Sequence, residues 1–452
     1  MGISRRNFMK MAALGSAGLA AGRASGSLMA RQSTKILGAN DRVRVGIVGF
    51  SNRCQDALIP AFIQHAPELN FEIVAVSDIW NLRREEGMAF LEEKTGQDVA
   101  GARNNEELYE KYNIDAVIIS TADFQHALHT VEAVKAGCDV YVEKPFAETM
   151  DDNRTALKAV QENKKIIQVG SQRRSGTNYI AANEYLRSGQ FGPVSMVEMT
   201  WNVNQPGRWR RPNLVASIKE TDTDWKRFLL NRPFEPWNPR KYVEFRLFWP
   251  YSSGIPGQWM CHQIDTIHWF TDLPRPRSVV ANGGVYVWKD GRENADTLTA
   301  VFDYGPLDDP KTGFQLVYTS RMHNSAGGTK ECYFSNAGKL DLDRNIVTPE
   351  GGLTEEFAAE MGMKANLLQE YKLPEQTVET AANTGSDPMT SGHMRNWMEC
   401  IRSRKAPRAD VMAGYHHAIA VIMTTAALRT GQRSSFDEET QEVMAGGKVF
   451  QY

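Results

Sequence analysis

An acidic, histidine-bearing turn and a lysine follow two consecutive apolar stretches of the chain. Residues 115–121 form an apolar run, and Asp123 and His126 come directly after it. A helical pattern then leads to a second apolar run, which ends at Glu143 and Lys144. Apolar runs joined by a helix predict parallel strands buried on both faces. Open α/β sheets bind ligands at the carboxyl ends of their strands, so these charged and imidazole groups predict a polar binding site.

The apolar run at 43–48 ends in a turn that keeps one glycine of the dinucleotide-binding fingerprint. Gly49 can make the tight turn, but Ser51 and Cys54 stand at the two other glycine positions. Ser51 places a side chain where the backbone should approach a pyrophosphate, and Cys54 replaces the glycine that lets helix and strand pack closely. Ser51, Asn52 and Arg53 offer hydrogen-bond donors to a phosphate instead.

An acidic residue follows the second predicted strand at the position typical of a ribose ligand. Asp78 stands there, and an acid at this point favours NAD over NADP. Arg83 and Arg84 are the counter-signal, because an arginine nearby can accommodate a 2′-phosphate. We therefore predict NAD as the cofactor, with NADP as the less favoured alternative.

Two motifs carry a family resemblance. Residues 120–127 (Ser-Thr-Ala-Asp-Phe-Gln-His-Ala) and 136–145 (Ala-Gly-Cys-Asp-Val-Tyr-Val-Glu-Lys-Pro) resemble the Gfo/Idh/MocA oxidoreductases, the relatives of glucose–fructose oxidoreductase and inositol dehydrogenase. Nearly all of the chain after its N-terminal segment shares this resemblance, which is nearest to the exported, carbohydrate-associated branch. Further matching segments are 169–175, 237–251, 283–297 and 396–405.

The resemblance implies roles for the residues at the strand ends. Thr121, Asp123 and His126 would lie along the nicotinamide half of the cofactor. Glu143 and Lys144 would lie close to its ribose and ring. In this family the lysine meets an Asp-x-x-x-His pair from the second domain, and lysine and histidine move a proton while hydride passes to or from the nicotinamide.

The matching run of the second domain is residues 257–269. His262 falls at the position of the catalytic histidine, and Gln258 stands where the family has aspartate. Glutamine can hydrogen-bond a sugar hydroxyl but cannot titrate. The ordinary alcohol-dehydrogenase assignment therefore lacks its aspartic acid here. His262 and His268 are six residues apart and do not share a helical face, so we expect no metal.

Four further residues are candidate sugar contacts. Trp249 and Tyr251 offer flat rings for pyranose C–H faces, and Arg173 is a fork of several donors. Asp265, near His262, is the fourth candidate. Each of the first three fits a core or surface position equally well.

Three functions remain open. The leading hypothesis is an NAD(P)-dependent oxidoreductase that acts at a ring carbon of a sugar or glycoside with a tightly bound cofactor. The first alternative is an NAD-dependent glycoside hydrolase that works by transient oxidation and elimination. The second is a non-catalytic sugar-binding scaffold, suggested by Ser51, Cys54 and Gln258.

The elements that position these residues change character along the chain. Strands and helices alternate over 41–170, which predicts an α/β Rossmann-type dinucleotide-binding domain. Residues 171–452 predict an α+β substrate and oligomerisation domain with a large, mainly antiparallel open sheet. Two late helices, at 392–404 and 411–429, are expected to pack back on the body. The segment 205–251 is rich in Trp, Pro and Arg and is predicted to be a long functional loop with short helices. Strands with alternating polarity are predicted at 197–203, 278–288, 297–303, 313–321 and 330–335.

The N-terminus predicts export. Residues 4–10 (Ser-Arg-Arg-Asn-Phe-Met-Lys) precede an apolar, small-residue stretch over 11–21, as in a twin-arginine signal. We assign 1–30 to a signal peptide and linker and expect a protein that is periplasmic or otherwise exported by the twin-arginine route. The apolar stretch is shorter than the roughly 20 residues that span a membrane, so no stable span is expected.

Composition limits the partners. The chain has 452 residues and a net charge of −2, which gives no electrostatic reason to expect nucleic acid. A small-molecule sugar or glycoside is the expected partner, and the resemblance implies a homo-oligomer. The five cysteines are scattered without a Cys-x-x-Cys, so most should be buried thiols. Lys144-Pro145 is a candidate cis peptide.

Overall fold

The computed structural model describes residues 41–309, 311–375 and 386–451. The signal peptide predicted over 1–30 lies outside the described residues.

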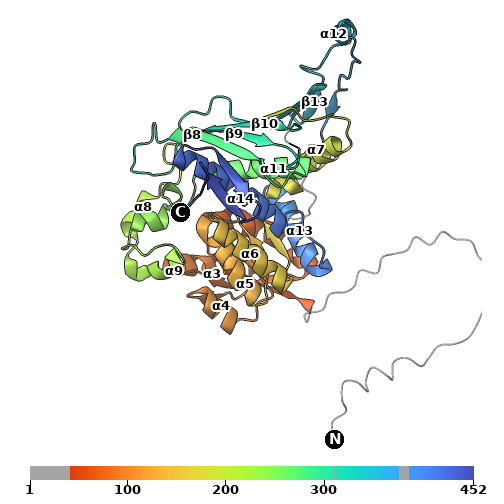
Figure 1. Cartoon of the computed structure of the whole chain (residues 1–452). Coiled ribbons are helices and arrows are strands. Elements are labelled where there is room, and N and C mark those ends of the chain that lie inside the picture. Colours follow the sequence, from red (N-terminus) through yellow and green to blue (C-terminus); the bar gives the residue numbers. More distant parts are fainter. Residues whose placement is uncertain (1–40, 310, 376–385, 452) are drawn as a thin grey trace, which may run out of the picture. The chain divides into compact units, whose positions relative to one another are not determined.

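The first half of the chain forms a six-stranded parallel sheet in the order β3-β2-β1-β4-β5-β6. The strands are buried on both faces, because α5 and α6 cover one face (Figure 1) and α2 and α13 cover the other. Successive strands are added on one side of β1 up to β3 and on its other side from β4 onward. The strand order therefore switches between β1 and β4, which is where doubly wound sheets bind ligands. This is the predicted Rossmann-type arrangement. The strands are β1 (Val43–Val48), β2 (Phe71–Ser77), β3 (Ala100–Ala102), β4 (Ala116–Ile119), β5 (Asp139–Val142) and β6 (Ile167–Val169). The helices among them are η2 (Cys54–Leu58), α2 (Ile59–Leu69), α3 (Asn81–Thr95), α4 (Asn105–Lys111), η3 (Asp123–Gln125), α5 (His126–Lys135) and α6 (Met150–Asn163).

The second half forms an 11-stranded sheet in the order β14-β13-β12-β11-β7-β10-β9-β8-β15-β16-β17. Among the described strands of this sheet, only β7 and β10 pair in parallel, so the sheet is mainly antiparallel as predicted. The predicted strands form its centre, whereas the short outer strands were not predicted. The strands are β7 (Met196–Asn202), β8 (Ser278–Gly284), β9 (Thr297–Tyr304), β10 (Phe314–Arg321), β11 (Thr329–Ser335), β12 (Gly338–Asp341), β13 (Ile346–Thr348), β14 (Tyr371–Lys372), β15 (Ser434–Asp437), β16 (Glu442–Ala445) and β17 (Lys448–Val449).

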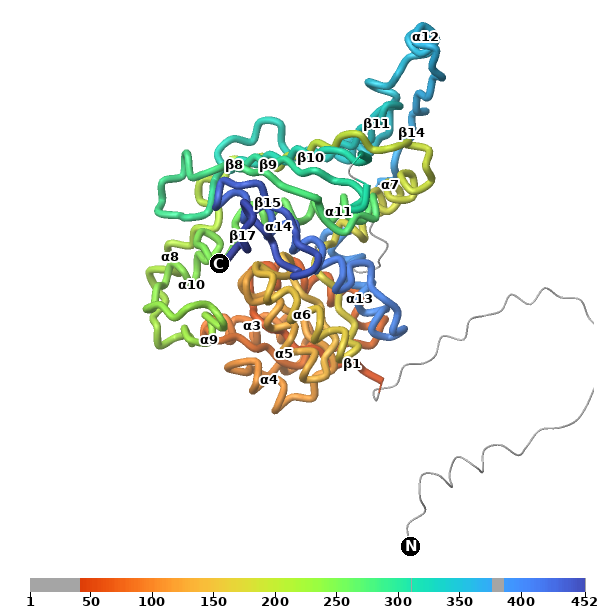
Figure 2. The backbone as a smooth tube through the Cα atoms, viewed as in Figure 1, coloured from red at the N-terminus to blue at the C-terminus, as the bar shows by residue number. Residues whose placement is uncertain are grey.

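Short helices follow β7 in the segment predicted to be a long loop with short helices. Figure 2 shows this segment, with α8 to α10, beside α3 of the first half. The ring of Trp80, before α3, packs edge-on against Tyr242 at 5.9 Å, and Arg227 lies 3.5 Å from Glu106 of α4. The segment therefore spans from the second sheet to the strand ends of the first. Its helices are α8 (Pro212–Ser217), η5 (Glu220–Asp222), α9 (Trp225–Leu229), α10 (Pro239–Val243) and η6 (Phe245–Leu247), followed by η7 (Pro256–Met260) and α11 (Cys261–Thr271).

The two late helices pack back on the body as predicted. Trp397 of α13 (Pro388–Ser403) contacts Tyr141 of the first sheet, and α14 (Val411–Thr430) contacts both β8 and α6. By length and composition α14 could cross a membrane, but 83% of its most apolar window is buried inside the protein. A core helix accounts for this pattern. The remaining helices are η4 (Gln172–Ser175), α7 (Thr177–Arg187) and α12 (Glu355–Glu360).

The five cysteines are buried free thiols, which confirms the prediction. Lys144-Pro145 is a cis peptide, as is Trp249-Pro250.

Candidate functional site

The turn after β1 uses its serine as a helix cap. Gly49 has φ +83°, and a Cβ there would lie 2.6 Å from Cγ2 of Thr121, so glycine is required. The Ser51 hydroxyl accepts a hydrogen bond from the Cys54 backbone N–H at 3.2 Å and contacts the Ser120 hydroxyl. Its side chain is therefore turned to the helix start and to the neighbouring strand end.

The helix that follows begins at Asn52 and has a π turn, η2, from the buried Cys54. Burial raises the pKa of the Cys54 thiol, which is therefore a packing group. The Asn52 side chain accepts from Arg83 at 3.2 Å, and Arg53 donates to Glu143 at 2.8 Å. These two side chains are thus engaged with protein groups. The backbone N–H groups of Asn52 and Arg53, in the first turn, have no partner within the helix and suit an anion.

Asp78 is held by its own turn. Its carboxylate accepts from the backbone N–H of Phe50 at 2.9 Å and of Trp80 at 2.8 Å. Burial raises its pKa in spite of these bonds and of Arg83 and Arg84. Asp78 and Arg83 line the same cavity. The residue that favours NAD and the residue that favours NADP therefore line one cavity.

This first cavity lies between the turns of the first sheet and the segment after β7. Its lining includes Gly49, Ser51, Asn52, Arg53, Asp78, Trp80, Arg83, Asn105, Thr121, Trp209, Arg211, Arg227, Tyr242 and Arg246.

A second cavity adjoins the first at the ends of β4 and β5. The two share Ser51, Arg53, Thr121 and Arg246, among other residues. Residues that line only the second cavity include His126, Glu143, Lys144, Gln172, Trp201, Arg208, Gln258, Trp259 and His262.

His126 and Glu143 hold the strand ends together. The His126 ring donates through Nδ1 to the Pro145 carbonyl at 2.8 Å, and burial lowers its pKa, so the ring is neutral. Burial alone would raise the pKa of Glu143, but Arg53 and Lys144 outweigh it and the pKa is lowered. Glu143 is therefore an ionised carboxylate that holds Arg53.

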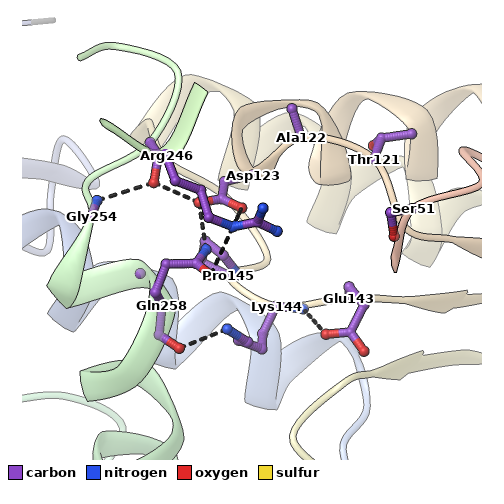
Figure 3. Close-up of polar contacts among 12 residues, drawn as sticks. Ser51, Thr121, Ala122, Asp123, Glu143, Lys144, Pro145, Arg246, Gly254 and Gln258 are labelled. Atoms are coloured by element: carbon purple, nitrogen blue, oxygen red, sulfur yellow. Dashed lines mark hydrogen bonds and ion pairs between the residues drawn. The ribbon is translucent and has the colours of Figure 1, made fainter. Parts of the chain in front are cut away.

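Lys144 and Gln258 both line the second cavity, and Figure 3 shows the contact between them. The Lys144 ammonium donates to the main-chain carbonyl of Gln258 at 2.7 Å. The Gln258 amide donates to Asp123 at 2.6 Å, and its carbonyl oxygen accepts from Arg246 at 2.9 Å. Asp123 is buried and does not itself line either cavity. Gln258 thus links a buried carboxylate to an arginine at the cavity wall.

A second buried acid lies near Asp123. Burial raises the pKa of Glu148 to about 8, and the charge of Asp123 adds to the shift, so Glu148 is protonated at neutral pH. Glu148 accepts two hydrogen bonds from Ser253. Glu148 and Ser253 are buried and line neither cavity.

His262 reaches the second cavity from α11. Its ring stacks on Trp201 at 6.1 Å, and Trp201 stacks on Trp259 at 6.0 Å. Burial, and then the charges of Lys144 and Arg173, lower the pKa of His262 well below its ordinary value. The structure therefore presents a neutral imidazole at the same cavity as Lys144.

Two charged candidates for sugar contact are occupied elsewhere. Arg173 forms an ion pair with the buried Glu331 and does not line either cavity. Asp265 accepts two hydrogen bonds from Arg174, at 2.7 and 3.0 Å. Burial alone would raise the pKa of Asp265, but Arg174 outweighs it and the pKa falls far below its usual range. Neither group faces the site.

The two aromatic candidates also lie outside the cavities. The Tyr251 hydroxyl binds Glu235, and its ring packs edge-on against Phe124 at 5.4 Å. The Trp249 ring lies 4.0 Å under the guanidinium of Arg429. The structure does not bring either ring to His262.

Other residues of the site were missed by sequence reasoning. They come from the segment after β7 and from η7, and the arginine and aromatic content of 205–251 was the available signal. They are Arg208, Trp209, Arg211, Arg246 and Trp259.

Comparison with known proteins finds relatives of the first domain. Residues 43–171 match the model of the oxidoreductase family with an NAD-binding Rossmann fold (GFO_IDH_MocA). Inositol 2-dehydrogenase of Rubrobacter xylanophilus is 31% identical over 210 residues, which cover 44% of this chain and 55% of that protein. The NADP⁺-dependent scyllo-inositol 2-dehydrogenase IolW of Bacillus subtilis is 24% identical over 181 residues, 39% of this chain and 47% of that protein. The chain thus spans about half the length of these relatives.

The fold likeness extends further. The WlbA dehydrogenase of Bordetella pertussis, solved with NADH and UDP-GlcNAcA, matches with a TM-score of 0.62 and 17% identity. The match covers 88% of this chain and 98% of that one. At this identity the likeness shows a shared two-domain fold.

Proposed function

Residues 43–171 of this chain belong to the Gfo/Idh/MocA family of NAD-binding oxidoreductases, and from this premise we propose that the protein oxidises or reduces a ring carbon of a sugar or glycoside. The observation that carries the proposal is the placement of Lys144 and a neutral His262 in one cavity, next to the cavity of the glycine turn.

The residues of the first cavity fit a nicotinamide dinucleotide. Gly49 makes the tight turn, and the first-turn N–H groups at Asn52 and Arg53 suit a pyrophosphate. The Thr121 hydroxyl is buried at both cavities and has no hydrogen-bond partner among the described residues, so it offers a hydrogen bond to the cofactor. When bound, the cofactor would supply the hydride acceptor or donor. Asp78 favours NAD, and Arg83 in the same cavity leaves NADP as the alternative.

The chain's own groups can move the hydroxyl proton. The Gln258 carbonyl holds one N–H of the Lys144 ammonium, so two remain for a substrate hydroxyl. The neutral His262 can accept a proton, because its ring is uncharged above its lowered pKa. Gln258, fixed between Asp123 and Arg246, can orient a hydroxyl but cannot titrate.

The segment after β7 favours a tightly held cofactor. Gln125 donates to the Phe228 carbonyl at 2.7 Å, and Phe228 packs edge-on against Phe124 at 5.4 Å. The hydrogen bond and the ring contact fasten the segment across the first cavity. Tight binding suits our proposal that the twin-arginine segment exports the folded protein to the periplasm. A homo-oligomer remains part of the proposal.

The first experiment identifies the nucleotide released when the purified protein is denatured, by absorbance and mass. Near-stoichiometric NAD(H) supports the redox site. Glycosides are then screened with and without an added acceptor. Lys144→Ala should keep its nucleotide and lose turnover by about 10²–10⁴-fold, whereas Lys158→Ala, at an exposed lysine of α6, should keep both.

The outcomes separate the three functions. NADH formation, or redox exchange between two sugars, supports the oxidoreductase. Release of an aglycone without net redox change would establish the glycoside hydrolase instead. Protein that binds neither NAD nor NADP would leave the sugar-binding scaffold.

A further inference from the structure

The second cavity is lined by a guanidinium, that of Arg208, which has no acceptor or carboxylate partner among the described residues. Within the described part of the chain, the Arg208 side chain forms no ion pair or hydrogen bond, and its Nε is buried with no acceptor. The guanidinium lies 5.5 Å above the Trp259 ring and 6.0 Å above the Trp209 ring. Tryptophan faces hold a cation in place but leave its N–H donors free.

The charge around Arg208 is not balanced. Burial, and then the charges of Arg246 and Arg211, lower the pKa of Arg208. The only carboxylate that lines the second cavity in the described residues is Glu143, which is already paired with Arg53. Half-buried cations are normally paired, because desolvation of a lone charge is costly. An anion from outside the protein would satisfy this group.

The neighbouring arginine in the sequence shows the contrast. Arg210 pairs with Glu244 at 3.0 Å and with Asp290 at 3.4 Å, and it does not line either cavity. The same segment therefore carries one arginine that is neutralised within the fold and one that faces the cavity unpaired.

The position of Arg208 relates it to the reacting groups. Arg208 lies over Trp259, Trp259 stacks on Trp201, and Trp201 stacks on His262. This row of rings forms a wall from the guanidinium to the imidazole. Arg208 lines the second cavity but not the first, unlike Arg211 and Arg246, so it suits a substrate group better than the cofactor's pyrophosphate.

From this geometry, and resting on the function proposed above, we propose that the sugar substrate carries an anionic group, a carboxylate or a phosphate, which Arg208 binds. The two N–H donors of one guanidinium edge match two oxygens of either group. Arg246 and Arg211 add positive charge beside it.

Binding of matched sugars tests the proposal. The protein, first shown to carry its nucleotide, is titrated with glucuronate, glucose 6-phosphate and glucose. Calorimetry and the fluorescence of the tryptophans beside Arg208 report binding. One anionic sugar should bind at least about tenfold more tightly than glucose, since charge-assisted hydrogen bonds are the stronger class. Glucuronate and glucose 6-phosphate distinguish the two sources of charge.

Arg208→Gln should remove that preference and leave the affinity for glucose within about twofold. Arg344→Gln, at an exposed arginine between β12 and β13, makes the same charge change away from the cavities and should alter nothing. Equal weakening of charged and neutral sugars, release of the nucleotide by Arg208→Gln, or no binding of either anionic sugar to nucleotide-loaded protein would overturn the proposal. An anionic preference that persists in protein without nucleotide or turnover would instead refute the proposed function and keep this inference.

Discussion

The wall that the first sheet contributes to the cavities and the wall that the second half contributes are built in different ways. In the first, polar residues follow β1, β2, β4 and β5 and meet at one sheet edge. In the second, the lining residues come from the irregular segment after β7 and from η7 and α11. Backbone hydrogen bonds fix the first wall, whereas side-chain pairs such as Arg174 with Asp265 support the second.

This difference explains which residue types in the sequence predict a place in the site. At a strand end, the sheet places any polar side chain near the ligand edge. In the second half, arginines and tryptophans serve equally as structural partners and as lining groups. Arg174 and Arg208 are an example, because the first neutralises a buried acid and the second faces the cavity.

The largest expected effect comes from breaking the support of the second wall. Arg174→Leu leaves the buried Asp265 without its counter-ion, so the free energy of unfolding should fall by about 3–5 kcal/mol. Urea unfolding measures this change. The double variant Arg174→Leu/Asp265→Leu should recover part of the loss, because no unpaired charge remains. Unchanged stability with lost sugar binding would instead place Asp265 among the substrate contacts.

A second prediction concerns the junction between α13 and the first wall. The His393 ring donates to the Val169 carbonyl at 2.8 Å, and burial lowers its pKa to about 4. The unfolded chain binds the proton near the ordinary pKa of about 6.5, so stability is lost as pH falls from about 6.5 to about 4.

The free energy of unfolding should fall by about 3 kcal/mol over that pH range, because the unfolded chain binds one more proton than the folded protein there. Urea unfolding at a series of pH values measures it. His393→Gln should flatten the pH dependence between these limits. An unchanged slope in the variant would show that other groups carry the acid sensitivity.

A third prediction tests the glycine turn. Gly49→Ala forces a side chain into a left-handed conformation and against Thr121, so nucleotide affinity should fall by at least about tenfold, at a backbone cost of about 1–2 kcal/mol. Titration of nucleotide-free protein with NAD measures the affinity. Gly96→Ala, at a left-handed helix end with open space around it, should cost stability without changing NAD affinity. Similar NAD binding by both variants would mean that the turn does not hold the cofactor.

The sequence predicted the fold further than it predicted the site. Strand and helix periodicity revealed the parallel sheet and the centre of the second sheet. The short outer strands β12 to β17 carry too few residues for a period to show. In the site, the residues at strand ends could be placed because sheet geometry brings them together. Trp249, Tyr251 and Arg173 could not, because their orientation depends on partners distant in sequence, such as Arg429, Glu235 and Glu331.

The smallest expected effect separates two tryptophans of the second half. Trp249 packs with Arg429 outside both cavities, so Trp249→Ala should leave sugar affinity within about twofold and lower stability modestly. Trp259 lines the second cavity and stacks on Trp201, so Trp259→Ala should weaken sugar binding by roughly tenfold, since such contacts contribute about 0.5–1.5 kcal/mol. Calorimetric titration of both variants with one sugar gives the comparison. Equal losses of sugar affinity in the two variants would mean that the second wall extends to Trp249. In that case the residue type in this half would predict site residues better than the observed packing does.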